Sequence, residues 1–480
     1  MSATVELPYW VLVLVLGFAA VAALDRILVP SARWFLRRRM QRAVDRLNQK
    51  LSVPIEPFKL VRRQDQVIRL IYDPQVMEAV TEYARERGIP QNIAFERARS
   101  YAREIVPGFS TATYFGFATK LAQKLSQGLY NVHLGGADSE ALRSIDKRAA
   151  VVFVINHRSN MDYVLVTWLA SKHSALSYAV GEWARIWPLK ALIRAMGAYF
   201  IRRRYSNHLY RAVLARYVQM SVEQGTTQAI FLEGGLSLDG SVGSARLGLL
   251  TYIVRDFKPD AGNGAGRDVV FVPVGVNYDR VLEDRVLIAA QAAKKRRFPV
   301  QPRVIARFVA GVLWKRLRGR FERFGHAAVC YGAPVSLRDF LQSAPAASVE
   351  ALGESLTARI RATVPILPVP LAAAAMAESD DPQDRAALID RATTLVQDLE
   401  DRGAWLQLTG GTVESAMESG LQALALRGII TQDGTRFSRV AKQDEVLQFY
   451  AASVRQRLGE QGLTTAAPRN PSVIPSPNPG

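Results

Sequence analysis

A histidine and an aspartate five positions apart stand in the segment Asn156–Tyr163, which reads Asn-His-Arg-Ser-Asn-Met-Asp-Tyr. A turn between a strand and a helix could bring them together, so that Asp162 accepts a proton from one imidazole nitrogen and leaves the other nitrogen of His157 as a general base. Acyl transfer to an alcohol needs such a base, because a hydroxyl group near neutral pH is a poor nucleophile until it loses its proton. The spacing alone also fits a surface histidine followed by a helix-capping aspartate.

A cluster of arginines is the second feature with chemical potential. The segment Gly197–Arg204 is a short apolar run that ends in Arg202, Arg203 and Arg204. Arginine clusters bind phosphate through bidentate, charge-assisted hydrogen bonds. A solvated basic face is the alternative interpretation of the same residues.

Two further segments place polar or shape-defining residues near expected strand ends. In Phe231–Gly240, the glycines permit a positive φ or a close backbone approach, and Glu233 could bind or orient a polar ligand. An ordinary glycine turn is the simpler alternative. In Val272–Arg280, Pro273 interrupts an apolar run, which is typical of an edge strand or of a shaped wall beside an apolar ligand.

The elements that must position these residues alternate along the chain. Short apolar, β-branched runs predict buried strands, and helical segments separate them, so the pattern favours an α/β fold with a largely parallel or mixed sheet flanked by helices. In such sheets the loops that follow the strands carry the chemistry. The expected strands are 149–155, 228–232, 268–274 and 327–331, and the expected helices are 164–171, 189–196 and 209–223.

The flanking regions differ in character, and additional helical regions are expected at both ends. Helical spacing precedes the sheet, and a proline-rich shift near residue 365 leads into a second helical region with no evident catalytic constellation. A Pro-, Ser- and Asn-rich tail at the end is expected to be disordered. We therefore divide the chain into 1–50 (membrane helix and basic segment), 51–130 (helical), 131–345 (catalytic), 346–462 (helical) and 463–480 (tail).

The amino terminus predicts a membrane helix. Residues 7–24 carry no charge and are followed by an arginine-rich block, and 18 residues would span about 27 Å in a helix. Because nothing basic precedes this run, the positive-inside rule places the rest of the chain on the cytoplasmic side of the inner membrane. A re-entrant or interfacial helix is the alternative.

The charge balance indicates an anionic partner. The 480 residues include 62 Lys and Arg against 43 Asp and Glu, a formal charge of +19, and the sole cysteine, Cys330, excludes an internal disulfide and a cysteine-based zinc site. Residues 294–323 hold eleven Lys or Arg and a single acid, with apolar residues between them. This segment suits an anionic phospholipid surface, the phosphates of coenzyme A, an acidic carrier protein or packing on the domain. We find no nucleic-acid recognition motif, so no nucleic-acid partner is expected.

Taken together, the motifs resemble the four-block pattern of the glycerolipid acyltransferase superfamily. The blocks are His-Arg-Ser-x-x-Asp-Tyr, Phe-Ile-Arg-Arg, Glu-Gly-Gly-x-Ser and Val-Pro-Val, in this order and each near an expected strand end. The Arg-Ser-x-x-Asp-Tyr variant, and the Tyr-Asp-Arg after the fourth block, look most like the membrane-bound glycerol-3-phosphate acyltransferases, including their dihydroxyacetone-phosphate relatives. The resemblance covers roughly residues 100 to 345.

The resemblance implies roles for individual residues. His157 would deprotonate the substrate hydroxyl, which attacks an acyl thioester on coenzyme A or acyl carrier protein, and Asp162 would orient and charge-stabilise the imidazole. No metal or bound cofactor is implied. The remaining positions carried over are substrate-binding: Arg202 and Arg203, with Arg158 and Ser159 nearby, for the phosphate; Glu233 and Gly234 for the glycerol phosphate; and Pro273 for the shape of the pocket.

One departure bears on the acceptor. The third block usually continues Glu-Gly-Gly-Arg-Ser, but Leu236 stands where the arginine is expected, and Arg246 in the following loop is a possible substitute. The expected reaction is acylation of glycerol-3-phosphate to lysophosphatidate in phospholipid synthesis. The alternatives are dihydroxyacetone phosphate or lysophosphatidate as acceptor, or a non-catalytic membrane scaffold with a degenerate acyltransferase domain.

Overall fold

The structure is a computed structural model of the whole chain. The residues that it describes are 8–11, 13–17, 63–109, 112–135, 139–171, 176–180, 193–194, 196–202, 207–255, 257, 267–293, 310–312, 314, 316–319, 321–344 and 348–459.

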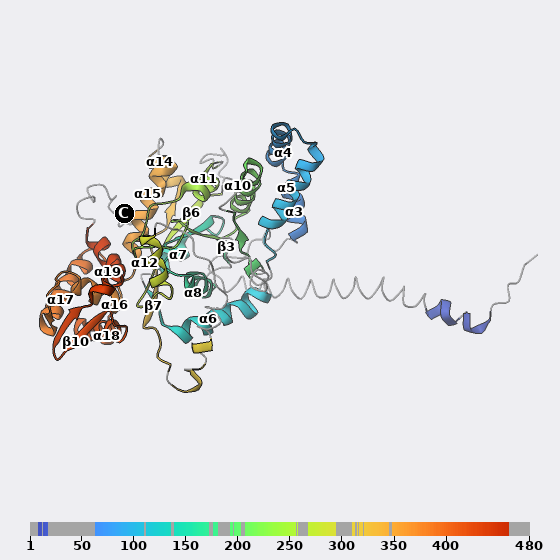
Figure 1. Cartoon of the computed structure of the whole chain (residues 1–480). Coiled ribbons are helices and arrows are strands. Elements are labelled where there is room, and N and C mark those ends of the chain that lie inside the picture. Colours follow the sequence, from blue (N-terminus) through green and yellow to red (C-terminus); the bar gives the residue numbers. More distant parts are fainter. Residues whose placement is uncertain are drawn as a thin grey trace, which may run out of the picture.

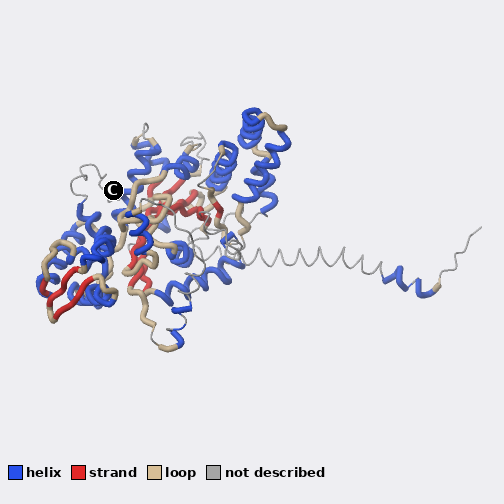
Figure 2. Tube along the Cα trace, viewed as in Figure 1, coloured by secondary structure: helices blue, strands red, loops and turns tan. Residues whose placement is uncertain are grey.

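A mixed, mostly parallel sheet forms the centre of the molecule (Figures 1 and 2). Its strands follow the order β1-β7-β6-β2-β5-β3-β4, and β8 also pairs with β6. All neighbours along this order run parallel except β6 and β7, and β8 is also antiparallel to β6. The expected α/β class with a central sheet flanked by helices is therefore confirmed. The strands are β1 (Asn131–Gly135), β2 (Ala150–Ile155), β3 (Ser177–Val180), β4 (Tyr199–Phe200), β5 (Gln228–Phe231), β6 (Val269–Tyr278), β7 (His326–Tyr331) and β8 (Val335–Ser336).

The central strands β2 and β6 are buried along their whole length, which explains their unbroken apolar sequences. Pro273 lies in β6 opposite Val154 of β2, so the interpretation of its segment as an edge strand is wrong. Its carbonyl accepts the N–H of Gly332 on the side away from β2. The N–H that proline lacks would point to this same side, between the residues that pair with β8 and those that pair with β7. The ladder between β2 and β6 therefore tolerates the proline.

Each face of the sheet is covered by its own apolar cluster. On β2, Val152 and Val154 face one cluster, whereas Phe153 and Ile155 face the other. The first cluster includes α3 (Arg63–Ile71), α4 (Pro74–Arg87), α5 (Gln91–Ile105), α10 (His208–Glu223), α11 (Leu247–Val254) and α15 (Val349–Thr363). The second includes α6 (Thr119–Leu129), α8 (Met161–Ala170), α12 (Asp284–Ala292) and α16 to α19.

The carboxyl-terminal region is mainly helical and packs on the second face, at the lower left of Figure 1. Its helix α16 is buried throughout because neighbouring helices surround it. A small antiparallel sheet, which the sequence analysis did not predict, accompanies these helices. The elements are α16 (Pro368–Met376), β9 (Gln383–Asp384), α17 (Arg385–Asp401), α18 (Val413–Leu426), β10 (Ile430–Asp433), β11 (Arg436–Arg439) and α19 (Asp444–Gly459); α14 (Leu337–Ser343) precedes α15. The predicted domain limits stay predictions.

Several expected features lie wholly or largely outside the described residues. Of the expected membrane helix at 7–24, residues 8–11 and 13–17 are described, and all of these except Pro8 are helical. Among the helices that are described, none is both long enough and apolar enough to cross a bilayer. Most of the expected helix 189–196, most of the basic segment 294–323 and the tail 463–480 are not described.

Candidate active site

The turn between β2 and α8 brings His157 and Asp162 together. The Nδ1 atom of His157 lies 2.9 Å from Oδ2 of Asp162, and both side chains are buried. The turn closes where the N–H of Asp162 donates to the carbonyl of Ser159. Because the carboxylate accepts the Nδ1 proton, Nε2 of His157 is the nitrogen that can take a proton from a substrate.

Three hydrogen-bond donors besides His157 bind the Asp162 carboxylate. Its Oδ2 atom also accepts the backbone N–H groups of Arg158 (2.7 Å) and Ser159 (3.0 Å). Its Oδ1 atom accepts the hydroxyl of Tyr278, from the end of β6, at 2.7 Å. Asp162 also lies in the first turn of α8, where the helix dipole favours negative charge. These four donors fix the carboxylate, so its orientation toward His157 is set by the fold.

The imidazole of His157 is enclosed by aromatic rings. It stacks on Phe231, with ring centroids 4.1 Å apart, and meets Tyr163 edge-on at 5.3 Å. Phe231 ends β5, the strand next to β2, so the aromatic contact follows from the parallel pairing. The ring is therefore held in one plane by packing as well as by Asp162.

The side chain of Glu233 contacts the backbone of the same turn. Its Oε1 accepts the N–H of His157 (2.9 Å), and its Oε2 accepts the N–H of Gly243 (3.0 Å). Burial raises the pKa of the Glu233 carboxyl, and these two backbone donors oppose that rise. Glu233 thus connects the loop after β5 to the histidine, while contact with a ligand stays a prediction.

Glu283, in the loop before α12, holds the turn from the other side. It accepts hydrogen bonds from the Ser159 hydroxyl (2.8 Å) and from the side-chain amide (3.0 Å) and backbone N–H (3.3 Å) of Asn160. Burial raises the pKa of Glu283, and the donors at Ser159 and Asn160 oppose the rise. Ser159 is fully buried, so in this structure it belongs to the frame of the turn.

Arg158 is buried beneath the carboxyl-terminal helix α19. Its Nη1 donates to the carbonyl of Gly240, and its guanidinium lies 5.2 Å from the ring centroid of Phe449. Its Nε and Nη2 atoms are buried and have no hydrogen-bond partner among the described residues. Burial lowers the pKa of Arg158, and the nearby Tyr450, Asp162 and Glu233 oppose this. A role for Arg158 in phosphate binding stays a prediction.

Arg202 follows β4 and is held by the amino-terminal helices. Its Nε and Nη2 atoms donate to the two carboxylate oxygens of Glu104 in α5, at 2.8 and 2.5 Å. Its guanidinium also lies over the rings of Tyr101 and Tyr210. Arg203 lies outside the described residues. The structure therefore does not gather Arg202 into the hydrogen bonds of the His157 turn.

The loop after β5 has the tight geometry that its glycines predicted. Gly234 has a φ of +65°, and a Cβ atom there would lie 2.9 Å from Cγ of Arg246. Arg246 is exposed, and its backbone N–H donates to the carbonyl of Leu232. Leu236 instead packs against the apolar cluster. The third block has Leu236 where an arginine is expected. Arg246, ten residues after Leu236, is thus the arginine that flanks Gly234.

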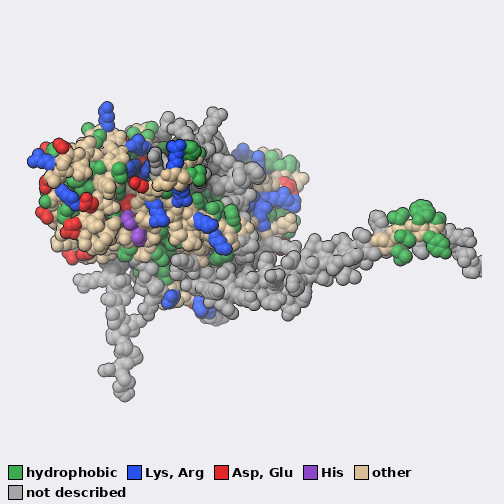
Figure 3. All heavy atoms as spheres, turned by 90° about the horizontal axis from the view of Figure 1, so that it is seen from below, with side chains coloured by type: hydrophobic (Ala, Val, Ile, Leu, Met, Phe, Trp, Pro, Cys, Tyr) green, Lys and Arg blue, Asp and Glu red, His purple; other side chains and the backbone are tan. Residues whose placement is uncertain are grey.

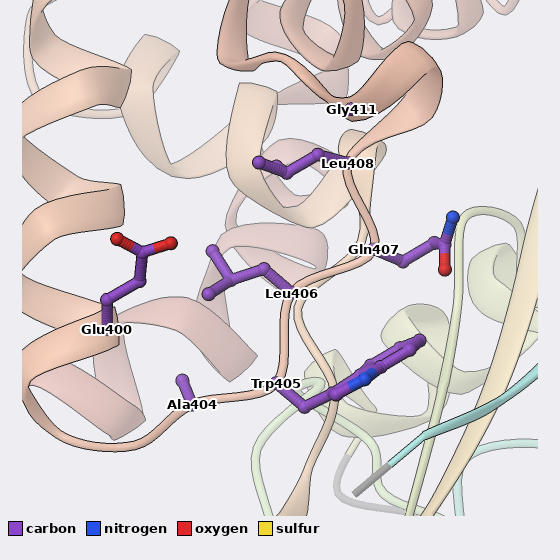
Figure 4. A pocket seen from close by; sticks show the side chains of 7 residues that line it. All are labelled: Glu400, Ala404, Trp405, Leu406, Gln407, Leu408 and Gly411. Carbon is purple, nitrogen blue, oxygen red and sulfur yellow. The ribbon is translucent and has the colours of Figure 1, made fainter.

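A separate hollow of about 510 Å³ lies in the carboxyl-terminal region (Figure 4). It is lined by Glu400, Ala404, Trp405, Leu406, Gln407, Leu408 and Gly411. These side chains include no nucleophile paired with a base, so the candidate site remains the His157 turn. In the described part of the chain, no group of three or more His, Cys, Asp or Glu could hold a metal ion.

Comparison with known proteins gives two family matches on this framework. Residues 137–277 match the family model described as Acyltransferase, and this range includes the His157 turn and β5. Residues 309–456 match the model described as Glycerol-3-phosphate acyltransferase C-terminal region. Curated relatives carry the same name: a "Glycerol-3-phosphate acyltransferase" of Ectopseudomonas mendocina is 29% identical over 376 residues, and that of Pseudomonas syringae pv. syringae is 27% identical over 361.

Both matched regions point to the same family. The resemblance to the glycerol-3-phosphate acyltransferase family and to the glycerolipid acyltransferase superfamily is therefore confirmed. The alignments cover 73% and 70% of this chain but only 42% and 41% of those two relatives, so the chain spans less than half of their length. A solved 1-acyl-sn-glycerophosphate acyltransferase from Thermotoga maritima is 18% identical and covers 62% of this chain and 98% of its own, with a TM-score of 0.30.

Sequence reasoning missed four residues that hold the predicted site residues in place. Tyr278 stood within a quoted block, and its place at the end of a buried strand beside β2 was the available signal. Asn156, which brackets Val276 of β6 with two hydrogen bonds, stood directly beside His157. Glu283 and Glu104 act across long sequence separations, and no local pattern marked either of them.

Proposed function

We propose that this protein transfers a fatty acyl group from an acyl thioester to the hydroxyl of glycerol-3-phosphate, forming lysophosphatidate. The observation that carries the proposal is the buried His157–Asp162 pair in a chain that matches both family models. A buried, correctly oriented imidazole beside a fixed carboxylate is suited to general-base catalysis. A scaffold without activity would have no need for four donors on Asp162.

In the proposed reaction, Nε2 of His157 takes the proton of the acceptor hydroxyl as its oxygen attacks the thioester carbonyl carbon. Asp162 stabilises the imidazolium that forms. The tetrahedral intermediate then expels the thiolate, which takes the proton back from His157. One ester and one thiol result, and the histidine returns to its starting state. Acyl-coenzyme A or acyl carrier protein would be the co-substrate, and the mechanism uses no metal or bound cofactor.

The acceptor is the finer part of the proposal. Of the described arginines that the sequence analysis considered for the phosphate, Arg202 is bonded to Glu104 and Arg158 is buried, whereas Arg246, the possible substitute, is exposed beside Gly234. A small, doubly charged acceptor fits such a guanidinium through charge-assisted hydrogen bonds. We therefore favour glycerol-3-phosphate over lysophosphatidate, whose acyl chain would need an apolar groove of its own.

The test is acyl transfer by the full chain in membranes or detergent, with palmitoyl-coenzyme A and palmitoyl carrier protein as alternative donors. Glycerol-3-phosphate, dihydroxyacetone phosphate and lysophosphatidate are offered separately as acceptors. The proposal expects labelled lysophosphatidate from glycerol-3-phosphate at the highest kcat/KM. Faster acylation of another acceptor would reassign the substrate, and no product from any pair would favour a scaffold.

We further propose that the protein works on an anionic phospholipid surface at the cytoplasmic side of the inner membrane. The support is a set of exposed apolar side chains beside arginines: Trp314 and Leu317 are 56% and 83% exposed, and Arg318 lies over the Trp314 ring at 4.1 Å. Arg316 bonds the carbonyl of Gly128 at the end of α6, whose Leu125 is also exposed. In Figure 3, acidic side chains gather at the left, whereas basic side chains are spread across the whole face, its left edge included. Apolar side chains next to cations suit an anionic interface.

Vesicle co-sedimentation tests this surface. We expect the full chain to bind phosphatidylglycerol vesicles better than phosphatidylcholine vesicles, and the double variant Trp314→Ala, Leu317→Ala to bind less. Leu426→Ala is the matched control, because Leu426 is 72% exposed on the carboxyl-terminal region. Equal loss in the variant and the control would contradict the assignment of this surface.

A further inference from the structure

The residues at the end of β6 have no assigned chemical part, yet they contact the catalytic turn directly. Tyr278 donates its hydroxyl to Oδ1 of Asp162 at 2.7 Å, and Oδ2 of the same carboxylate faces Nδ1 of His157 at 2.9 Å. Tyr278, Asp162 and His157 thus form one hydrogen-bonded series across three elements. All three side chains are buried, so water does not compete for these bonds.

We propose that Tyr278 is a positioning residue that fixes the Asp162 carboxylate and thereby sets the proton affinity of the base His157. This inference rests on the proposed function, in which His157 accepts the proton of the acceptor hydroxyl. Tyr278 does not touch the substrate in this account. It acts through Asp162.

The donor role of Tyr278 is stable over the whole working pH range. Burial raises the pKa of its hydroxyl well above the usual value, and the charge of Asp162 raises it further. Tyr278 therefore keeps its proton and can only donate to the carboxylate. A donor on Oδ1 draws negative charge toward that oxygen, so less charge faces the imidazole. Removal of this donor in a variant should therefore leave more negative charge facing the imidazole, which favours the protonated ring.

The turn is a suitable place for such tuning because few bonds can rearrange there. Glu283 accepts three hydrogen bonds from Ser159 and Asn160, and Asn156 holds Val276, two residues before Tyr278, through both of its amide atoms. The turn is therefore held at one end by its bonds to β6 and at the other end by its bonds to Glu283. Loss of the tyrosine hydroxyl should change the charge distribution on Asp162 with little movement of the backbone.

Other ionisable groups face His157 and Asp162, and the variants must leave these groups unchanged. They come from the turn itself, the loop after β5, the end of α6, the loop before α12, and α19. These groups are Arg158, Glu233, Tyr130, Glu283 and Tyr450.

Tyr130 offers a matched control. Its ring lies 5.3 Å from that of Tyr278, its side chain is equally buried, and its hydroxyl donates to the carbonyl of Arg280 at 2.7 Å, away from Asp162. Tyr278→Phe and Tyr130→Phe each remove one buried hydroxyl from the same ring pair. Only the first removes a donor from Asp162.

The experiment measures kcat and KM against pH for the full chain and both variants. For Tyr278→Phe we expect kcat to fall about 10-fold with KM for acceptor and donor unchanged, and the acid limb of kcat/KM to move up by about half a pH unit. Tyr130→Phe should leave that limb in place. An unmoved limb in Tyr278→Phe, or the same movement in both variants, would overturn the inference.

A second measurement does not depend on activity. The exchange of the C2 hydrogen of His157 for deuterium depends on the protonation of the ring and can be read from peptides by mass spectrometry. Its pH midpoint should rise in Tyr278→Phe and not in Tyr130→Phe, even if the protein acylates none of the acceptors. A failed assay with a shifted midpoint would reject the proposed function but keep the positioning role, and an unshifted midpoint with normal wild-type activity would reject only the role of Tyr278.

Discussion

Glu104 of α5 binds the guanidinium of Arg202 through both of its carboxylate oxygens, at 2.8 and 2.5 Å. A carboxylate held in this way occupies the two N–H donors that a substrate phosphate would use. The helical region before the sheet therefore competes for an arginine to which the family resemblance assigns phosphate binding.

If Arg202 binds the acceptor phosphate, Glu104→Gln should lower KM for glycerol-3-phosphate about 3- to 10-fold, because the competing charge is gone. KM for the acyl donor should stay constant. Asp73→Asn is the control, since it removes the negative charge from the bond between the N-cap of α4 and Arg216 of α10 (2.7 Å) without touching Arg202. An unchanged or higher KM in Glu104→Gln would show that the bond between Arg202 and Glu104 serves only the fold.

Arg246, beside the loop after β5, should contribute to the same KM for glycerol-3-phosphate. Its exposed side chain flanks Gly234, so Arg246→Ala should raise KM for glycerol-3-phosphate about 10-fold through loss of one charge-assisted bond. Arg255→Ala removes an exposed charge just past the other end of α11 and should have little effect. Equal effects of the two substitutions would reduce the role of Arg246 to general attraction of anions.

The contact between Gly240 and α19 predicts a large stability effect. Gly240 has a φ of +84°, and a Cβ atom there would lie 1.9 Å from the carbonyl oxygen of Phe449. Gly240→Ala should therefore lower the free energy of unfolding by about 3 kcal/mol or more. Gly428 has a φ of +67° with nothing within 4 Å of its Cβ position, so Gly428→Ala should cost only about 1 kcal/mol of conformational strain. Chemical denaturation compares the two, and equal losses would mean that α19 moves aside freely.

Asp279 makes stability depend on pH. It accepts the N–H of Val369, at the start of α16, and the N–H of His326, and burial raises the pKa of its carboxyl to about 7 despite these donors. Between about pH 4 and about pH 7 the folded protein keeps a proton that the unfolded chain has released. Stability from this group is therefore complete below this range and is lost as the pH rises through it.

The substitution Asp279→Asn removes the titrating group. Burial lowers the pKa of His326 to about 4, and this group acts in the opposite direction over much of this range, so the contribution of Asp279 is read from the difference between the two proteins. From about pH 4.5 to about pH 7, the thermal midpoint of the wild-type protein should decrease relative to that of the variant, whatever their absolute stabilities. Parallel slopes in the two proteins would contradict the assignment to Asp279.

The parts of the fold that the sequence predicted are those determined by local pattern. The runs that became β2, β5, β6 and β7 are apolar and β-branched, because both faces of these strands are covered. The strands β3 and β4 were not predicted, since they are short and stand beside other strands only through tertiary pairing. The same holds for the small sheet of β9, β10 and β11.

The contacts of the candidate site also differ in whether a local sequence pattern predicts them. His157 and Asp162 share one turn, so a short segment was enough to suggest their contact, although the spacing alone also fitted a surface histidine followed by a capping aspartate. The contacts of Tyr278, Glu283 and Phe449 depend on how distant segments are brought together, which spacing within one motif does not encode. Arg158 shows the same limit, because only the position of α19 makes it a buried side chain.

We propose that His157 is the base for acyl transfer to a glycerol phosphate. The decisive measurement is the rate at which the full chain and its His157→Ala variant convert radiolabelled glycerol-3-phosphate and palmitoyl-coenzyme A to lysophosphatidate. We expect product from the wild-type protein and a loss of about 10²- to 10⁴-fold in kcat for the variant, with the folded state intact by thermal denaturation. A variant that retains wild-type activity would contradict it.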